Sequence, residues 1–115
     1  MPRPAIDRGY IRRKQRAQTK RGDLWRAMRM LRRFTAGDLC AVCETDRRDA
    51  VVTFLSQLRR AGFVTIAHQG NQAYHQPNAF RLARDTGPRP PALLAKRHSM
   101  FDPNTETEYS FAFTT

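Results

Sequence analysis

The sequence predicts a mainly α domain with a small β-hairpin, preceded by a disordered basic arm and followed by an extended tail. Apolar residues recur at helical spacing in three segments between residues 23 and 62. A Gly-Asn pair then separates two extended segments, which is typical of a hairpin. Prolines cluster after residue 84, where they disfavour helix. We therefore divide the 115 residues into an arm (1–22), a domain (23–85) and a proline-containing linker with an extended tail (86–115).

Positive charge is concentrated at the N-terminus. The formal net charge is +11, and residues 1–33 carry 12 Lys or Arg against 2 Asp or Glu. Residues 1–22 combine this charge with two prolines and few apolar side chains, so they bury too little surface to order themselves. Such an arm favours acidic partners, nucleic acid first among them. A solvated tail that only aids solubility is the alternative.

The first two helices are expected over residues 23–34 and after Thr35. The first has Asp23 at its start and an apolar stripe made of Leu24, Ala27, Met28, Leu31 and Phe34, widened by Trp25 and Met30. Thr35 and Asp38 have the spacing of a capping box, which predicts a second helix of two turns. Cys40 and Cys43 are expected on or beside its core face.

The third helix is expected to follow the cap-type residues Thr45 and Asp46 and to stop at Gly62. Its apolar positions are Val51, Phe54, Leu55 and Leu58. The hairpin strands are expected over 63–68 and 73–75, with Pro77 limiting the second strand and residues 79–83 continuing it after a break.

The tail predicts one further strand, over residues 108–114. Tyr109, Phe111 and Phe113 alternate there with small or polar residues, so they share one face of an extended segment. A lone strand must pair, and leaving three aromatic side chains in water is unfavourable. The partner is either the hairpin of the same chain or the tail of a second chain, and the second case predicts a homodimer.

Three helices followed by a hairpin resemble the winged helix-turn-helix DNA-binding proteins. Residues 34–39 match the usual entry into the second helix, and residues 55–64 look like the exit from a recognition helix into the wing. Residues 80–88 and 101–105 are similar to small regulators encoded by transposable phages and prophages. The resemblance implies a transcriptional regulator that binds double-stranded DNA in the cytoplasm or nucleoid of a bacterial host.

The resemblance also implies which residues contact DNA. Residues off the apolar stripe of the third helix would enter the major groove: Arg47, Arg48, Asp49, Val52 and Thr53. Local pairing of the two arginines with Asp46 or Asp49 is the alternative. The arm and first helix would clamp the backbone through Arg12, Arg13, Lys14, Arg16, Lys20 and Arg21. The uncharged wing tip, with Gln69, Asn71 and Gln72, is either a phosphate contact or a plain turn.

Other function classes find little support in the residues. Cys40 and Cys43 lack a second Cys or His pair at zinc-site spacing, so we expect no metal and no cofactor. No phosphate loop, carboxylate pair or nucleophile motif predicts an enzyme or a catalytic residue. No apolar run approaches the roughly 18 residues of a membrane span, and we expect no membrane contact. The second hypothesis is an adaptor that uses the same scaffold to bind a protein or inhibit a host factor.

Overall fold

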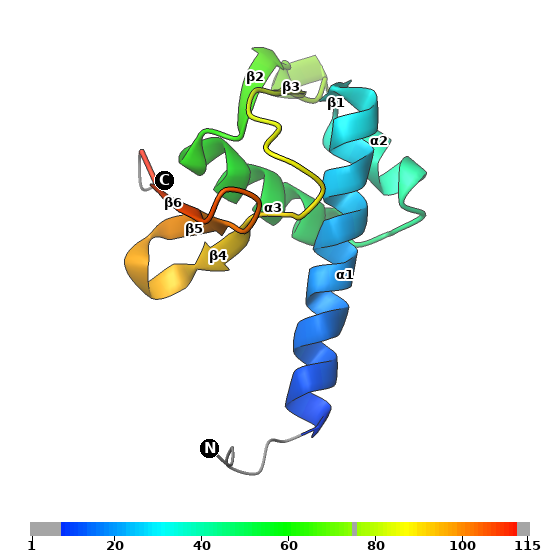
Figure 1. Ribbon diagram of the computed structural model, residues 1–115. Helices are drawn as coiled ribbons and strands as arrows, with labels where there is room; N and C mark the ends of the chain where they lie inside the picture. The colour runs from blue at the N-terminus through cyan, green and yellow to red at the C-terminus, as the bar shows by residue number, and fades with distance from the viewer. Residues whose placement is uncertain (1–7, 75, 113–115) are drawn as a thin grey trace, which may run out of the picture.

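The computed structural model shows three helices and two antiparallel sheets (Figure 1). It describes the backbone of residues 8–74 and 76–112, and the side chains from residue 20 onward except that of residue 72. The elements in chain order are α1 (Arg8–Leu31), β1 (Arg33–Phe34), α2 (Ala36–Val42), α3 (Arg48–Ala61), β2 (Val64–His68), the 3-10 turn η1 (Gln72–Tyr74), β3 (Ala79–Leu82), β4 (Ala92–Leu94), the 3-10 turn η2 (Ala95–Arg97), β5 (Ser99–Asp102) and β6 (Thr107–Ser110).

Helix α1 begins much earlier than the sequence predicted. Residues 8–22, expected as a disordered arm, form its first half, and that half projects away from the rest of the protein (Figure 1). Ten of its fifteen residues are Arg, Lys, Gln or Ala, which all have high helix propensity, so a continuous helix is locally favourable. The expectation of a disordered arm is therefore wrong for residues 8–22, and residues 1–7 lie outside the described residues.

The end of α1 also differs from the prediction. Arg32 adopts a left-handed conformation, with φ 65°, and turns the chain out of the helix. Phe34, expected as the last helical residue, lies instead in β1, where its buried side chain faces the core. Met30, expected in the apolar stripe, is 71% exposed, whereas Trp25 is fully buried.

The capping box of the second helix and the glycine stop of the third are confirmed, whereas neither Thr45 nor Asp46 caps the third helix. Asp38 N donates to Thr35 Oγ1 (3.1 Å) and Thr35 N donates to Asp38 Oδ2 (2.8 Å), which completes the capping box of α2. Helix α3 starts after Arg47 without a side-chain cap. It stops at Gly62, whose φ of 88° is strained for any residue with a Cβ.

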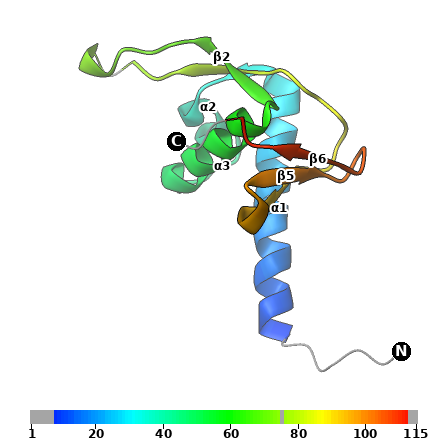
Figure 2. The ribbon, with the colours of Figure 1, turned by 90° about the vertical axis from the view of Figure 1, so that its left-hand side faces the viewer.

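The first sheet has the strand order β1-β3-β2. The second hairpin strand was predicted at residues 73–75, but residues 72–74 form η1 and residue 75 lies outside the described residues. The strand that pairs with β2 is β3. The long connection between β2 and β3 extends beyond the helices (Figure 2). It needs glycine at position 70, because a Cβ there would collide with the carbonyl oxygen of Gln76.

The second sheet replaces the predicted extended tail. Its order is β4-β5-β6, and Met100 of β5 lies opposite Tyr109 of β6. Tyr109 and Phe111 pack against the core of their own chain, so the reason for invoking a second chain does not apply to them. Phe113 lies outside the described residues, and the homodimer stays a prediction.

These findings correct the fold class. The protein is mixed α/β, with a mostly β C-terminal half, and not a mainly α winged helix-turn-helix domain with a small hairpin. The strands that sequence reasoning missed have two to four residues, which is too short for an alternating pattern to emerge. One core joins helices and both sheets, since Trp25, Leu58, Phe63 and Met100 are all fully buried within it.

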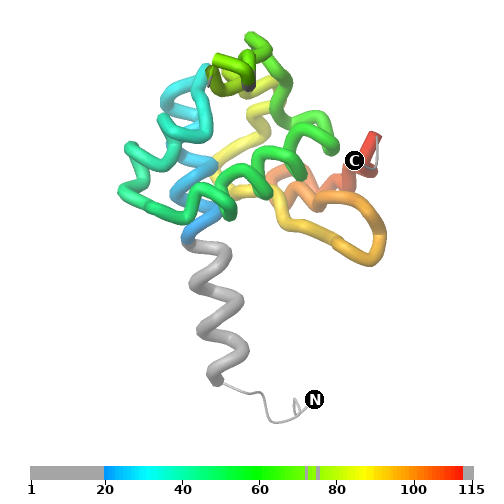
Figure 3. The backbone as a smooth tube through the Cα atoms, turned by 180° about the vertical axis from the view of Figure 1, so that it is seen from behind, coloured from blue at the N-terminus to red at the C-terminus, as the bar shows by residue number. Residues whose placement is uncertain are grey.

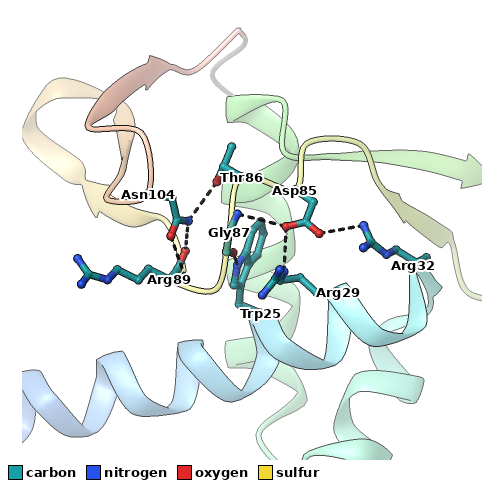
Figure 4. A network of polar contacts seen from close by, with 8 residues as sticks. All are labelled: Trp25, Arg29, Arg32, Asp85, Thr86, Gly87, Arg89 and Asn104. Carbon is teal, nitrogen blue, oxygen red and sulfur yellow. Dashed lines mark hydrogen bonds and ion pairs between the residues drawn. The ribbon is translucent and has the colours of Figure 1, made fainter.

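The segment between the two sheets is held by polar contacts from both sides (Figure 4). On the α1 side, Trp25 Nε1 donates to the carbonyl of Gly87 (2.8 Å), and Asp85 pairs with Arg29 (2.8 Å) and Arg32 (3.0 Å). On the other side, the Asn104 side chain accepts from the Arg89 amide (3.1 Å) and donates to the Arg89 carbonyl (2.8 Å). The second sheet is therefore fixed relative to α1.

We expect Asn104→Ala to lower the free energy of unfolding by about 1–3 kcal/mol, because both backbone groups of Arg89 lose their partner. Urea denaturation followed by circular dichroism measures this change. Gln76→Ala, at an exposed position of the β2–β3 connection, is the control and should stay within about 0.5 kcal/mol of the parent protein. Equal midpoints for the two variants would contradict the prediction.

Candidate nucleic-acid interface

Helix α3 turns one face to the core and leaves the other uncovered. Val51, Phe54, Leu55 and Leu58 are buried, as predicted, whereas the exposed positions of the helix are Arg48, Asp49, Ala50, Val52, Thr53 and Arg59. Seen from behind, α3 crosses in front of α1 (Figure 3). All five residues predicted to read DNA from this helix and its first turn, Arg47, Arg48, Asp49, Val52 and Thr53, are exposed.

Two of these residues interact with each other. Arg47 Nε lies 3.4 Å from Asp49 Oδ1, with the side chains 62% and 78% exposed. This hydrogen bond, followed by one from a backbone amide, lowers the pKa of the Asp49 carboxyl, so the group is charged at neutral pH. The local pair considered as an alternative for Arg47 is thus present, and Asp49 offsets its charge.

Arg48 is the strongest candidate for contact with a base or phosphate. Its side chain is exposed, and no partner is found for it among the described residues. Val52 is 49% exposed one turn further along the same face. Sequence reasoning stopped at Thr53, but Ser56 and Arg59 extend the same face toward the C-terminus of α3, and Arg59 is exposed. Continuing the spacing of three and four residues from Arg48 would have found them.

The predicted backbone clamp lies on α1. Arg12, Arg13, Lys14 and Arg16 are in its first half, and their side chains lie outside the described residues. Lys20 is exposed. Arg21 instead packs on α3: its guanidinium lies 5.1 Å from the centre of the Phe54 ring and within 3.5 Å of Gln57 Oε1, and burial lowers its pKa. Arg21 therefore joins residues 8–22, the basic half of α1, to α3.

The predicted wing tip lies in the connection between β2 and β3. Gln69 and Asn71 are exposed, while the side chain of Gln72 lies outside the described residues. Asn71 Oδ1 accepts from the amide of Ala73 (3.0 Å), so this side chain shapes the turn. No charged residue joins them between positions 69 and 74.

A cleft of about 640 Å³ separates α1 from the start of α3. Its lining includes charged residues of both signs: Lys20, Arg21 and Arg47 against Asp23, Glu44, Asp46 and Asp49. The acidic side chains outnumber the basic ones, so a phosphate is not favoured inside the cleft. The outward face of α3 remains the better surface for an anionic partner.

Cys40 and Cys43 are partly buried and pack against the core, which confirms their predicted position. Burial raises the pKa of the Cys43 thiol, and the nearby groups of Asp23 and Cys40 add to the effect. Within the described part of the chain, no three His, Cys, Asp or Glu residues are grouped as metal ligands. No described helix combines the length and apolar character needed to cross a membrane.

Comparison with known proteins gives no relative on which to base an assignment. No protein-family model, curated protein or solved structure matches the chain.

We expect Cys43 to react slowly with iodoacetamide, because each unit by which a thiol pKa rises lowers the thiolate population about tenfold. The measurement is the alkylation rate of a Cys40→Ser variant between pH 7 and 10, in buffer and in 8 M urea, read by mass spectrometry. The apparent pKa should be higher in buffer than in urea. Coincident pH profiles would contradict the prediction.

Proposed function

We propose that this chain binds double-stranded DNA, with the exposed face of α3 in the major groove and the basic half of α1 along the phosphate backbone. The observation that carries the proposal is the junction of these two elements. Arg21 of α1 lies on Phe54 and near Gln57 of α3, so the basic half of α1 is packed against the helix whose exposed face carries Arg48.

The charge of α1 supports a polyanionic partner. Residues 8–21 contain seven Lys or Arg and no Asp or Glu. Arg8, Arg12, Arg16 and Lys20 recur every four residues, and like charges at this spacing destabilise an isolated helix. Phosphates along a duplex remove that repulsion and release counterions, which favours binding at low salt.

The side chains on α3 support contact with bases. Arg48 offers a planar guanidinium that matches the O6 and N7 acceptors of guanine, and Val52 and Thr53 carry methyl groups that suit the thymine methyl. The local resemblance of residues 34–39 and 55–64 to segments of DNA-binding proteins supports the same partner, although the fold as a whole is mixed α/β. We extend the proposal to a site-specific regulator of phage or mobile-element origin.

The test is selection of bound duplexes from a random pool, followed by affinity measurements over excess competitor DNA. A regulator enriches a defined sequence, and Arg48→Ala then lowers its affinity for that sequence by about 1–3 kcal/mol. Weak binding without enrichment, confined to low salt, would favour the adaptor hypothesis and overturn the proposal of a site-specific regulator.

We expect the triple substitution Arg12→Gln, Arg13→Gln and Arg16→Gln to weaken binding to all duplexes and to leave sequence preference unchanged. If each side chain neutralises one phosphate, the slope of log K against log salt should fall by about 3. Fluorescence anisotropy at four salt concentrations measures the slope.

The control for this triple variant removes the same charge in and near the second sheet, at Arg89, Lys96 and Arg97. Its salt slope should match that of the parent protein. A slope that changes in the control and stays constant in the α1 variant would refute the role given to α1.

We expect Asp49→Asn to strengthen binding at low salt, because it removes a negative charge from the α3 face and releases Arg47. One additional phosphate contact should make the salt slope steeper by about 0.9. Glu106→Gln makes the same change of charge in the turn between β5 and β6 and should have no effect. Weaker binding of the Asp49 variant to the selected sequence would contradict the prediction.

A further inference from the structure

The solvent face of the first sheet carries two arginines directly opposite each other. Arg33 of β1 pairs with Arg81 of β3, and Thr65 of β2 pairs with Arg81 on its other side. All three are exposed, while the neighbouring pair Phe34 and Phe80 stacks on the opposite face, toward the core. The antiparallel register therefore places the two arginine side chains next to each other on one face of the sheet.

The repulsion between these two arginines is not offset by an acidic partner among the described residues. Like charges directly opposite in a sheet are destabilising. The acidic residue nearest in sequence to Arg81 is Asp85, and both its oxygens are occupied: Oδ1 accepts from Arg29 and from the amide of Gly87, and Oδ2 pairs with Arg32. Among the described residues, neither Arg33 nor Arg81 has a partner.

We propose that this pair, the Arg33–Arg81 face, binds the phosphodiester backbone of DNA as a second surface, separate from α3. The inference rests on the proposed function, because DNA is the partner in both. The separation follows from the packing. The sheet turns Phe34, Val64 and Leu82 to the same core that the buried face of α3 contacts, so the core lies between the two solvent faces. The two surfaces then hold different segments of DNA.

The chemistry of the face favours phosphate over an acidic protein. Two adjacent guanidinium groups present planar sets of donors that match phosphate oxygens in a bidentate manner. Protein interfaces depend on large apolar or aromatic anchors. The uncovered neighbours of the pair are Thr65 and Ala83, which are small. The face thus offers charge and hydrogen bonds without an apolar anchor.

The test is capture of a second duplex. The protein is bound to an immobilised duplex that carries its selected sequence, and a labelled duplex of unrelated sequence is then added. The parent protein should retain the labelled duplex, and R33Q/R81Q should lose roughly two phosphate contacts and with them most of this retention. Its affinity for the immobilised duplex should stay within about twofold of the parent value. R89Q/K96Q, with the same loss of charge, should capture the labelled duplex as the parent does.

Two further measurements decide whether the pair is structural. The melting temperature of R33Q/R81Q should equal or exceed that of the parent protein, because the substitution relieves repulsion across the strands. A lower melting temperature would overturn the inference, since it would give the pair a stabilising role in the fold. Retention of labelled polyglutamate in place of the duplex, lost in R33Q/R81Q, would also overturn it in favour of an acidic protein partner.

Failure of this inference is distinct from failure of the proposed function. If Arg48→Ala weakens binding to the selected duplex while R33Q/R81Q captures the second duplex normally, the Arg33–Arg81 face is refuted and DNA binding by α3 stands. If no sequence is selected, the salt slope for an arbitrary duplex replaces the capture assay. A slope that R33Q/R81Q lowers by about 2 then supports the face, and an unchanged slope overturns it.

Discussion

The anchoring of residues 85–89 to α1 is the constraint on which the rest of the structure depends. This segment leads from the first sheet to the second, and the Trp25 indole, buried in the core, donates to its Gly87 carbonyl. With this point fixed, the second sheet lies against the C-terminal end of α3, where the Arg84 guanidinium is 5.5 Å from the Phe63 ring centre and 4.2 Å from that of Tyr109. Helix α3 is thus held along its buried face and at its C-terminal end, which leaves its outward face open to a partner.

In this arrangement, the arginines near the core and those at the surface have different physical roles. Near the core, arginines act through packing and pairing: Arg21 lies on Phe54, Arg60 lies 5.8 Å from the Phe111 ring centre, and Arg84 lies beside the Phe63 and Tyr109 rings. At the surface, Arg48 of α3 has no such partner among the described residues. The formal charge of +11 therefore overstates the charge available to an anionic partner, because part of it is committed to the fold.

Sequence reasoning succeeded where the signal is local and failed where it depends on pairing between distant segments. The capping box at Thr35 and the helix stop at Gly62 are read within a few residues, and the apolar stripe of α3 correctly predicted which of its faces is exposed. Strand β1 has only two residues, and its partner Arg81 lies far along the chain, so neither the strand nor the Arg33–Arg81 pair has a local signature. The helical state of residues 8–22 was missed because charge was taken as a sign of disorder, although the same residues favour helix.

Because the N-terminal segment is helical, its positive charges are spread over a fixed length. An α-helix rises about 1.5 Å per residue, so residues 8–21 extend about 21 Å. Bases in a duplex are stacked about 3.4 Å apart, and the segment therefore matches the length of about six base pairs. If the chain binds DNA as proposed, a flexible arm would protect a variable stretch of the duplex, whereas a helix would give a footprint with a defined edge on one side of the bases bound at α3.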